Sequence, residues 1–170
     1  LIDGYGEALK ISVIEGGELW RRMSRKDDWN ADVLIELLPL FIEAKMKIVR
    51  RDPFEKLGMR QILNLGHTLG HVIESDLKIS HGMSVLLGLG FAQEWGLHLG
   101  ITKQKYVEIP SHCEALKKIK NLKRLLGQDK KRSQHGSVNF IFIERPGRVI
   151  RKSVTIDEVA AEVRRQIRGN

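Results

Sequence analysis

The stretch RQILNLGHTLGHVIESDLKISHG, residues 60–82, decides how this chain folds. His67 and His71 stand four residues apart, and His81 follows ten residues after His71. Each of the three histidines has a glycine as a direct neighbour in the sequence. Glycine disfavours helix, yet the apolar residues of this stretch recur at helical intervals. The regular spacing of the histidines and the glycines beside them therefore need an explanation other than helix formation.

The apolar pattern predicts one uninterrupted helix over residues 59–75. At about 100° per residue, its polar residues share an arc of roughly 80°; they are Arg60, Asn64, His67, His71 and Glu74. A plain solvent-facing surface is the simpler interpretation, but such surfaces usually carry Lys, Glu and Gln, which form helices better than Asn and His. Gly66 and Gly70 each cost about 1 kcal/mol relative to Ala. We therefore expect a functional stripe, with both glycines under a closely packed neighbour.

Histidines in this pattern indicate a metal site. Imidazole suits zinc and the neighbouring transition metals, and a carboxylate often completes the ligand set. His67 and His71 could chelate one ion from successive turns, although the Glu of the HExxH motif is missing. Alternatively, His67 pairs with His81 and a remote carboxylate. The spacing leaves both arrangements open.

The composition is that of an ordinary globular domain. The 170 residues are 42% hydrophobic and 29% charged, which suits one domain with its own core. No apolar run approaches the about 18 residues of a membrane span, so we expect no membrane partner. The single cysteine, Cys113, excludes an intrachain disulfide framework and suits a cytoplasmic location.

The formal net charge of +8 raises the question of nucleic acid. The basic residues are spread along the chain, without a helix-turn-helix, zinc-knuckle or aromatic-rich strand motif. Solvated helix faces are the preferred interpretation, and nucleic acid is not expected as a partner. The charge is compatible with a small anionic ligand but does not establish one.

The fold class predicted from periodicity is mainly α, a helical domain with one small β-hairpin near the C-terminus. Helices are expected over residues 5–23, with a break at Gly16 and Gly17, and over 31–50, 59–75, 83–99, two short segments after Ser111, and 157–168. We expect caps at Asn30, at Ser111 with Glu114, and at Thr155 or Asp157, and a kink or split at Pro39. Alternating Val138, Phe140 and Phe142, followed by Pro146-Gly147, predict the hairpin.

The sequence resembles a known family, the 3-dehydroquinate synthases. GMRQILNLGHTLGHVIES followed by HGMSVLLGLGFA resembles the family pattern GLRxxLNxGHxxGHAIE followed by HGExVAxGM. GYGEALK is similar to the family's G-x-x-E-x-x-K segment, KMKIV to its K-x-x-V-V, and QDKKRSQHGSVNFIFIE to its D-K-K stretch before a β-hairpin. These matches keep their order from residue 4 to about residue 154. They resemble the C-terminal, metal- and substrate-binding domain of the family.

The resemblance implies a set of site residues. The implied ligands of a zinc or cobalt ion are Glu7, His67 and His81. The implied substrate contacts are Lys10, Lys45, Arg60, Asn64, His71 and Lys131. The match of Lys45 requires one extra residue in the loop DPFEKLG, and Lys130 is the alternative to Lys131.

The implied activity is a metal- and NAD-dependent cyclisation. The family converts the seven-carbon acid phosphate DAHP (3-deoxy-D-arabino-heptulosonate 7-phosphate) to 3-dehydroquinate with loss of phosphate, in the shikimate pathway. The expected partners are this anionic substrate, an NAD-binding N-terminal domain and, in the full enzyme, a second copy in a homodimer.

Two departures qualify the resemblance. Family members are about twice as long, and these 170 residues contain no glycine fingerprint or βαβ pattern for NAD. The chain is therefore expected to be one domain, a C-terminal half that is inactive alone. The family's His-Gly-Glu reads His81-Gly82-Met83 here, so a related sugar-phosphate cyclase, of the 2-deoxy-scyllo-inosose or valiolone synthase type, is the alternative. A non-catalytic helical binding module, with a closed structural metal site, is the alternative from another class.

Overall fold

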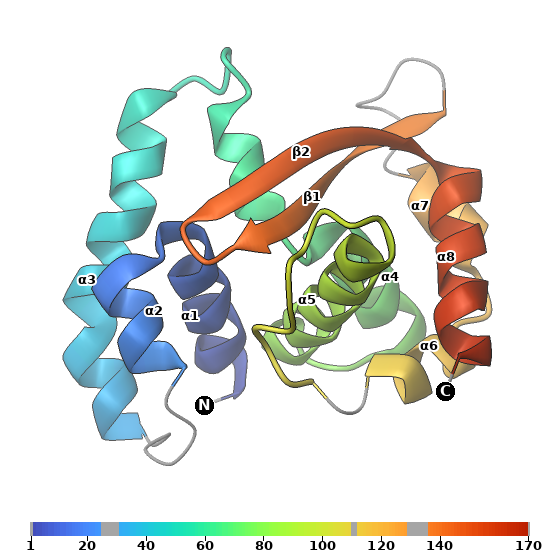
Figure 1. The fold of residues 1–170 in the computed structure, drawn as a ribbon, viewed down its shortest axis with the longest axis horizontal. Helices are drawn as coiled ribbons and strands as arrows, with labels where there is room; N and C mark the ends of the chain where they lie inside the picture. The colour runs from blue at the N-terminus through green and yellow to red at the C-terminus, as the bar shows by residue number, and fades with distance from the viewer. Residues whose placement is uncertain (1, 25–30, 110–111, 129–135, 170) are drawn as a thin grey trace.

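A nearly buried helix forms the centre of the molecule. The computed structural model describes residues 2–24, 31–109, 112–128 and 136–169. In this part, α5 (His81–His98) is buried along most of its length, and α1 (Ile2–Glu15) and α4 (His67–Leu77) pack directly against it. Figure 1 shows α5 between α1 on one side and α8 (Ile156–Arg168) on the other. The apolar α5 sequence, LLGLGFA, suits this surrounded position.

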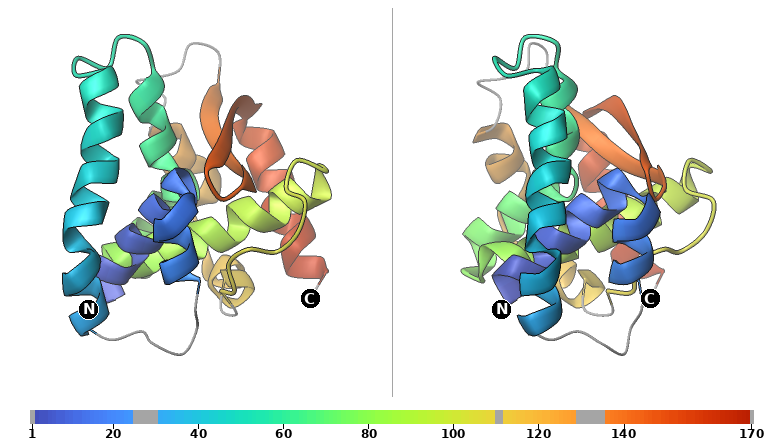
Figure 2. Two further views of the ribbon diagram at one scale, coloured as in Figure 1. Left: turned by 60° about the vertical axis from the view of Figure 1, so that its left-hand side comes forward. Right: turned by 90° about the vertical axis from the view of Figure 1, so that its left-hand side faces the viewer.

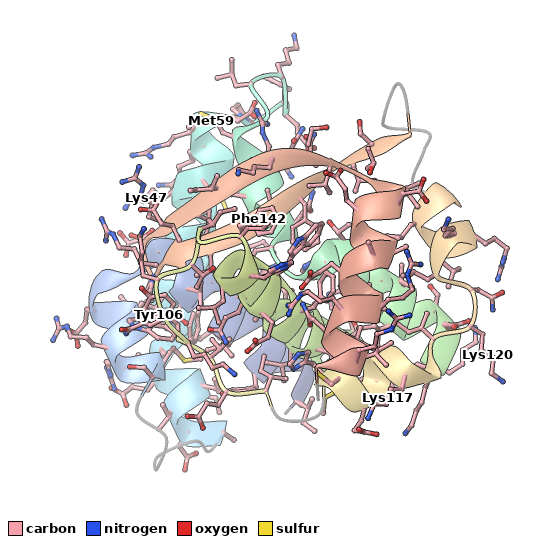
Figure 3. The ribbon with its side chains drawn as sticks, turned by 45° about the vertical axis from the view of Figure 1, so that its right-hand side comes forward. Lys47, Met59, Tyr106, Lys117, Lys120 and Phe142 are labelled. Atoms are coloured by element: carbon pink, nitrogen blue, oxygen red, sulfur yellow. The ribbon has the colours of Figure 1, made fainter. Side chains whose placement is uncertain are left out.

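The hairpin covers one side of α5. Strands β1 (Ser137–Arg145) and β2 (Arg148–Thr155) pair antiparallel, with Phe142 opposite Ile150. Trp95 of α5 packs against Phe140 and Phe142, at centroid distances of 4.8 and 5.2 Å. Phe142, labelled in Figure 3, is fully buried between the hairpin and the helices. The predicted fold class, mainly α with one C-terminal hairpin, is confirmed.

The remaining helices are peripheral. α2 (Gly17–Met23) and α3 (Ala31–Arg51) pack beside α1, and α6 (His112–Lys118) and α7 (Leu122–Gln128) lie near α8. Lys117 and Lys120 point into solvent in Figure 3, in line with solvated charges on the helix faces. No helix in the described ranges combines the length and the apolar character that a membrane span needs.

Glycines permit the central helices to touch backbone to backbone. A Cβ added at Gly6 would collide with the carbonyl oxygen of Gly82, and one added at Gly88 would collide with that of Gly66. A Cβ on Gly70 would lie 3.1 Å from the carbonyl oxygen of Ser84. The expectation that Gly66 and Gly70 lie under a packed neighbour is therefore confirmed, and that neighbour is α5.

The prediction of one helix over residues 59–75 is wrong. A 3-10 helix, η1 (Met59–Asn64), ends before Leu65, and α4 begins only at His67. Gly66 between them has φ of 77°, a left-handed conformation that favours glycine. Leu65 is fully buried, and the close approach of Gly66 to Val85 and Gly88 turns the chain there. Tertiary packing thus overrides the helical periodicity.

The other local predictions have mixed outcomes. The break at Gly16, with φ of 70°, is confirmed, and α8 is capped by Thr155 in a capping box with Glu158. Pro39 does not split α3; the carbonyl group that it deprives of a helical partner belongs to Ile35, which is exposed and can bond to water. The expected caps Asn30 and Ser111 lie outside the described residues.

We expect Gly6→Ala to destabilise the protein by about 2–3 kcal/mol, or to prevent folding, because the new methyl group overlaps the Gly82 backbone. Gly4→Ala, in the same helix with nothing within 4 Å, should leave stability unchanged or raise it by up to about 1 kcal/mol. Urea unfolding followed by circular dichroism measures both. Equal midpoints for the two variants would contradict the close-packing explanation.

Candidate metal centre

Three side chains from three helices converge at one point. Glu7 comes from α1, His67 is the first residue of α4, and His81 is the first residue of α5. One ligand atom from each lies within 4.8 Å of the others. The Oε1 atom of Glu7 lies 3.4 Å from Nε2 of His67 and 3.6 Å from Nε2 of His81. The structure thus brings together the three residues that the resemblance implies as ligands.

Hydrogen bonds on the far sides of the imidazoles fix which nitrogen is protonated. Nδ1 of His67 lies 3.1 Å from the carbonyl oxygen of Leu65, and Nδ1 of His81 lies 3.1 Å from Oε2 of Glu74. A carbonyl oxygen and a carboxylate can only accept, so each Nδ1 carries the proton. Both Nε2 lone pairs then face the Glu7 carboxylate. Three acceptors that face one another form a site that a cation can occupy.

A proton on His67 does not meet that need at neutral pH. Burial, followed by the positive charge of Lys10, lowers the pKa of His67 to about 4. For Glu7, burial acts to raise the pKa, but Lys10, with contributions from His67 and Lys45, brings it below its usual value. The group therefore presents a carboxylate and a neutral imidazole, which are the protonation states that bind metal.

The spacing fits a tetrahedral ion. With metal–ligand distances of about 2.0–2.2 Å, adjacent ligand atoms of a tetrahedral site lie about 3.3–3.6 Å apart. The two measured distances, 3.4 and 3.6 Å, come close to this value without rearrangement. A carboxylate with two imidazoles is a donor set for zinc or cobalt.

A second group overlaps the first. His71, Glu74 and His81 also bring ligand atoms within 4.8 Å of one another. The described residues contain these two groups of possible ligands, and neither group includes both His67 and His71. Of the two arrangements left open by the spacing, the geometry therefore favours His67 with His81 and a remote carboxylate, rather than chelation by His67 and His71.

Two lysines lie close to Glu7. Lys10, one turn later on α1, donates to both carboxylate oxygens, at 2.9 and 2.8 Å, and is only 3% exposed. This lysine, which the resemblance implies as a substrate contact, is engaged with Glu7 here. Burial lowers the pKa of Lys10, while the charge of Glu7 opposes that effect. Lys45 is exposed on α3, and its positive charge contributes to the lowered pKa of Glu7.

Of the other implied substrate contacts, two lie on η1 and one lies outside the described residues. Arg60 and Asn64 lie on η1, before the break, so they do not share a helical stripe with the histidines. Arg60 is half-buried and donates from Nη1 to the carbonyl oxygen of Pro53, while its buried Nε has no protein partner among the described residues. Asn64 is exposed at the end of η1. Lys131 and its alternative Lys130 lie outside the described residues.

His71 borders a cavity between α4, α7 and β1. Its ring lies 5.2 Å from that of His67, centroid to centroid, and is exposed. The cavity has a volume of about 250 Å³; it is lined by Thr68, His71, Val72, Ser75, Leu125, Leu126 and Val138. The predicted role of His71 as a substrate contact is compatible with this place. Glu74 belongs to the predicted polar stripe, but neither the spacing nor the resemblance assigned it a role in the site; its membership of that stripe was the usable signal.

Comparison with known proteins gives a consistent result. The family model described as 3-dehydroquinate synthase C-terminal matches residues 4–132. A 3-dehydroquinate synthase of Pyrobaculum aerophilum is 33% identical, and the match covers 94% of this chain and 50% of the relative. A bifunctional shikimate kinase/3-dehydroquinate synthase of Thermotoga maritima is 29% identical and is matched over 32% of its length. The chain spans about half the length of the curated 3-dehydroquinate synthases that it matches over most of its own length.

A solved structure shares the fold. A 2-deoxy-scyllo-inosose synthase complexed with carbaglucose-6-phosphate, NAD+ and Co2+ superposes with a TM-score of 0.68. The match covers 96% of this chain and 51% of the other, at 18% sequence identity. At that identity the likeness establishes the fold alone.

In metal-free protein, we expect the imidazole of His67 to stay neutral through pH 6.5 and to protonate only near pH 4, because burial disfavours its charge. Below about pH 6.5 the unfolded chain binds this proton and the folded chain does not, so the residue lowers the free energy of unfolding as the pH falls from about 6.5 towards 4. NMR titration of the ring protons measures the pKa. Lys10→Met should raise it; a wild-type value near 6.5 would contradict the prediction.

Proposed function

This chain belongs to the 3-dehydroquinate synthase C-terminal family, and we propose that it forms the metal- and substrate-binding half of a 3-dehydroquinate synthase. The proposed reaction is the cyclisation of DAHP to 3-dehydroquinate with loss of phosphate. The observation that carries the proposal is the convergence of Glu7, His67 and His81 from three helices.

These three residues are the proposed ligands of one zinc or cobalt ion. The ion, when bound, would polarise hydroxyl and carbonyl oxygens of the substrate as a Lewis acid. Within the described residues, the group around Glu7 offers three ligands. Three protein ligands with an open position are typical of catalytic zinc, whereas structural zinc has four. The ligand count therefore supports an enzyme over a metal-stabilised binding module.

The charged residues around the centre are proposed to hold the substrate. Lys45 and Arg60 can pair with its carboxylate or phosphate, and an arginine can do so through two parallel hydrogen bonds. Lys131 is the proposed phosphate contact on the basis of the sequence. Asn64 and His71 would orient substrate oxygens, and Lys10 would keep Glu7 ionised and in place. Rigid helices carry most of these groups, which favours pre-orientation of a flexible substrate.

Met83 bears on the choice of substrate. Its side chain is half-buried and packs against the hydrophobic core, so the site lacks the carboxylate that the resembling family has at this position. Relatives that are 33% and 34% identical to the chain are named 3-dehydroquinate synthases, which supports DAHP as the substrate. A related cyclase is the second candidate, because the superposed 2-deoxy-scyllo-inosose synthase shares the fold.

An NAD-binding domain is the proposed partner, since the matched relatives are about twice as long as the chain. Helix α3 lies at the edge of the molecule with one face open (Figure 2). Five large apolar side chains on it are exposed. Four of them recur every three or four residues and so share one face, namely Ile35, Leu38, Ile42 and Met46, and the fifth is Leu40. Lys45 lies about two turns after Leu38 on the same side. We propose that the NAD-binding domain covers this face. Assembly as a homodimer and a cytoplasmic location stay predictions.

We expect the chain to bind about one zinc ion, and His67→Ala, His81→Ala or Glu7→Gln to abolish binding, because each removes one of three ligands. His71→Ala should leave binding largely intact, and His98→Ala, far along α5, is the control. Isothermal titration calorimetry measures stoichiometry and affinity. Loss of the metal in His71→Ala but not in His81→Ala would replace this ligand set by another.

We expect no turnover by the chain alone, and phosphate release from DAHP when an NAD-binding domain of the family, NAD and zinc are supplied. A colorimetric phosphate assay measures the rate, and the His67→Ala chain is the matched control. Release from glucose 6-phosphate but not from DAHP would assign the chain to the second candidate. Release from neither, with a full-length relative active in parallel, would count against the proposed function.

A further inference from the structure

The two ring nitrogens of His81 face two different ligand groups. Nε2 points to Glu7 and His67, whereas Nδ1 lies 3.1 Å from Oε2 of Glu74, in the group that includes His71. A neutral imidazole has one protonated nitrogen and one lone pair. A neutral His81 can therefore offer its lone pair to only one of the two groups at a time. The group that holds its proton determines which nitrogen carries the lone pair.

The backbone of His81 is fixed independently of its ring. The N–H of Gly82 donates to Oδ1 of Asp3 at 2.7 Å, and the hydroxyl of Ser84 donates to the carbonyl oxygen of His81 at 2.6 Å. The contact between Gly6 and Gly82 holds the same point against α1. These contacts place Cα of His81 but leave the ring free to turn and to exchange tautomers.

His67 and His81 differ in how their tautomers are set. The proton on Nδ1 of His67 is held by a backbone carbonyl, that of Leu65, which no substitution removes. The proton on Nδ1 of His81 is held by one side chain, Glu74, half-buried on α4. The two ligands thus offer an internal comparison within one site.

Building on the proposed function, we propose that Glu74 is a positioning residue that holds the proton on Nδ1 of His81 and so directs its Nε2 lone pair to the group of Glu7 and His67. A carboxylate that accepts from the outer nitrogen of a ligating histidine fixes the ring and raises the basicity of the ligating nitrogen. Glu74 acts through His81 and is not itself a ligand.

The competing group of His71, Glu74 and His81 is the weaker site. It would require Glu74 to leave the Nδ1 proton, and His81 to present Nδ1 instead. His71 is exposed, whereas His67 is 14% exposed and Glu7 is held at both oxygens by Lys10. A group whose members are already oriented loses less conformational entropy when it binds an ion.

The first test is the tautomer of His81 in the metal-free chain, read from nitrogen-15 chemical shifts at a pH where the ring is neutral. The wild type should show the proton on Nδ1 of both His67 and His81. Glu74→Ala should remove this preference at His81 and leave it at His67, whose partner is the Leu65 carbonyl. An unchanged His81 tautomer in Glu74→Ala would overturn the proposal, and so would a wild-type His81 protonated on Nε2.

The second test is zinc affinity of the same chain, measured by competition with a chelator. Glu74→Ala should keep the stoichiometry at one ion and weaken affinity by about 10–100-fold. Glu74→Gln, whose amide oxygen can still accept from Nδ1, should lose less than about 10-fold, and Glu43→Ala, an exposed carboxylate on α3, is the matched control.

The outcomes separate this proposal from the proposed function. Unchanged affinity in Glu74→Ala overturns the positioning role while the metal site stands. Loss of the ion in both Glu74→Gln and His71→Ala would show that Glu74 is a ligand of the competing group. That result would also overturn the positioning role. Unchanged binding in the Glu7, His67 and His81 variants would overturn the metal site itself.

Discussion

The close contact between helix backbones at glycines is the constraint on which this structure depends. Each candidate ligand is adjacent in sequence to a glycine at such a contact: Glu7 follows Gly6, His67 follows Gly66, and His81 precedes Gly82. A methyl group at these glycines would push α1 or the start of α4 away from α5. Since the ligand atoms lie 3.4 and 3.6 Å apart, a shift of even about 1 Å would spoil the site. The cost of glycine in a helix, about 1 kcal/mol, is small by comparison.

A buried ammonium group organises the electrostatics of the same site. Lys10 holds both oxygens of Glu7, and its charge helps to keep Glu7 ionised and His67 neutral. A positive charge beside a cation site weakens the attraction for the ion. In exchange, Lys10 fixes the orientation of the Glu7 carboxylate before an ion binds. The site therefore relies on oriented lone pairs more than on net negative charge.

The family match and the shared fold give different information about the substrate. The family match covers most of the chain, and the relatives are named 3-dehydroquinate synthases. The fold is shared with a 2-deoxy-scyllo-inosose synthase at 18% identity, so the architecture alone does not choose the sugar phosphate. Substrate choice then depends on particular side chains, and Met83, apolar where the family pattern has Glu, is one such difference. The open apolar face of α3 suggests that part of the site environment belongs to another domain.

The sequence by itself determined the fold class, most helix positions and the hairpin, which follow from local causes: hydrophobic period and the turn at Pro146-Gly147. The spacing of the histidines indicated a metal site, whereas the resemblance to the family implied Glu7 as a ligand. Tertiary structure alone decided the rest. Leu65 is buried and Gly66 approaches α5, so the predicted helix over residues 59–75 breaks, and Arg60 and Asn64 leave the histidine stripe. Where the spacing left two arrangements open, the structure favours His67 with His81 over His67 with His71, and it shows that Glu74 meets His81. Periodicity describes one helix at a time, whereas these features depend on how closely two backbones approach, which only the packed structure sets.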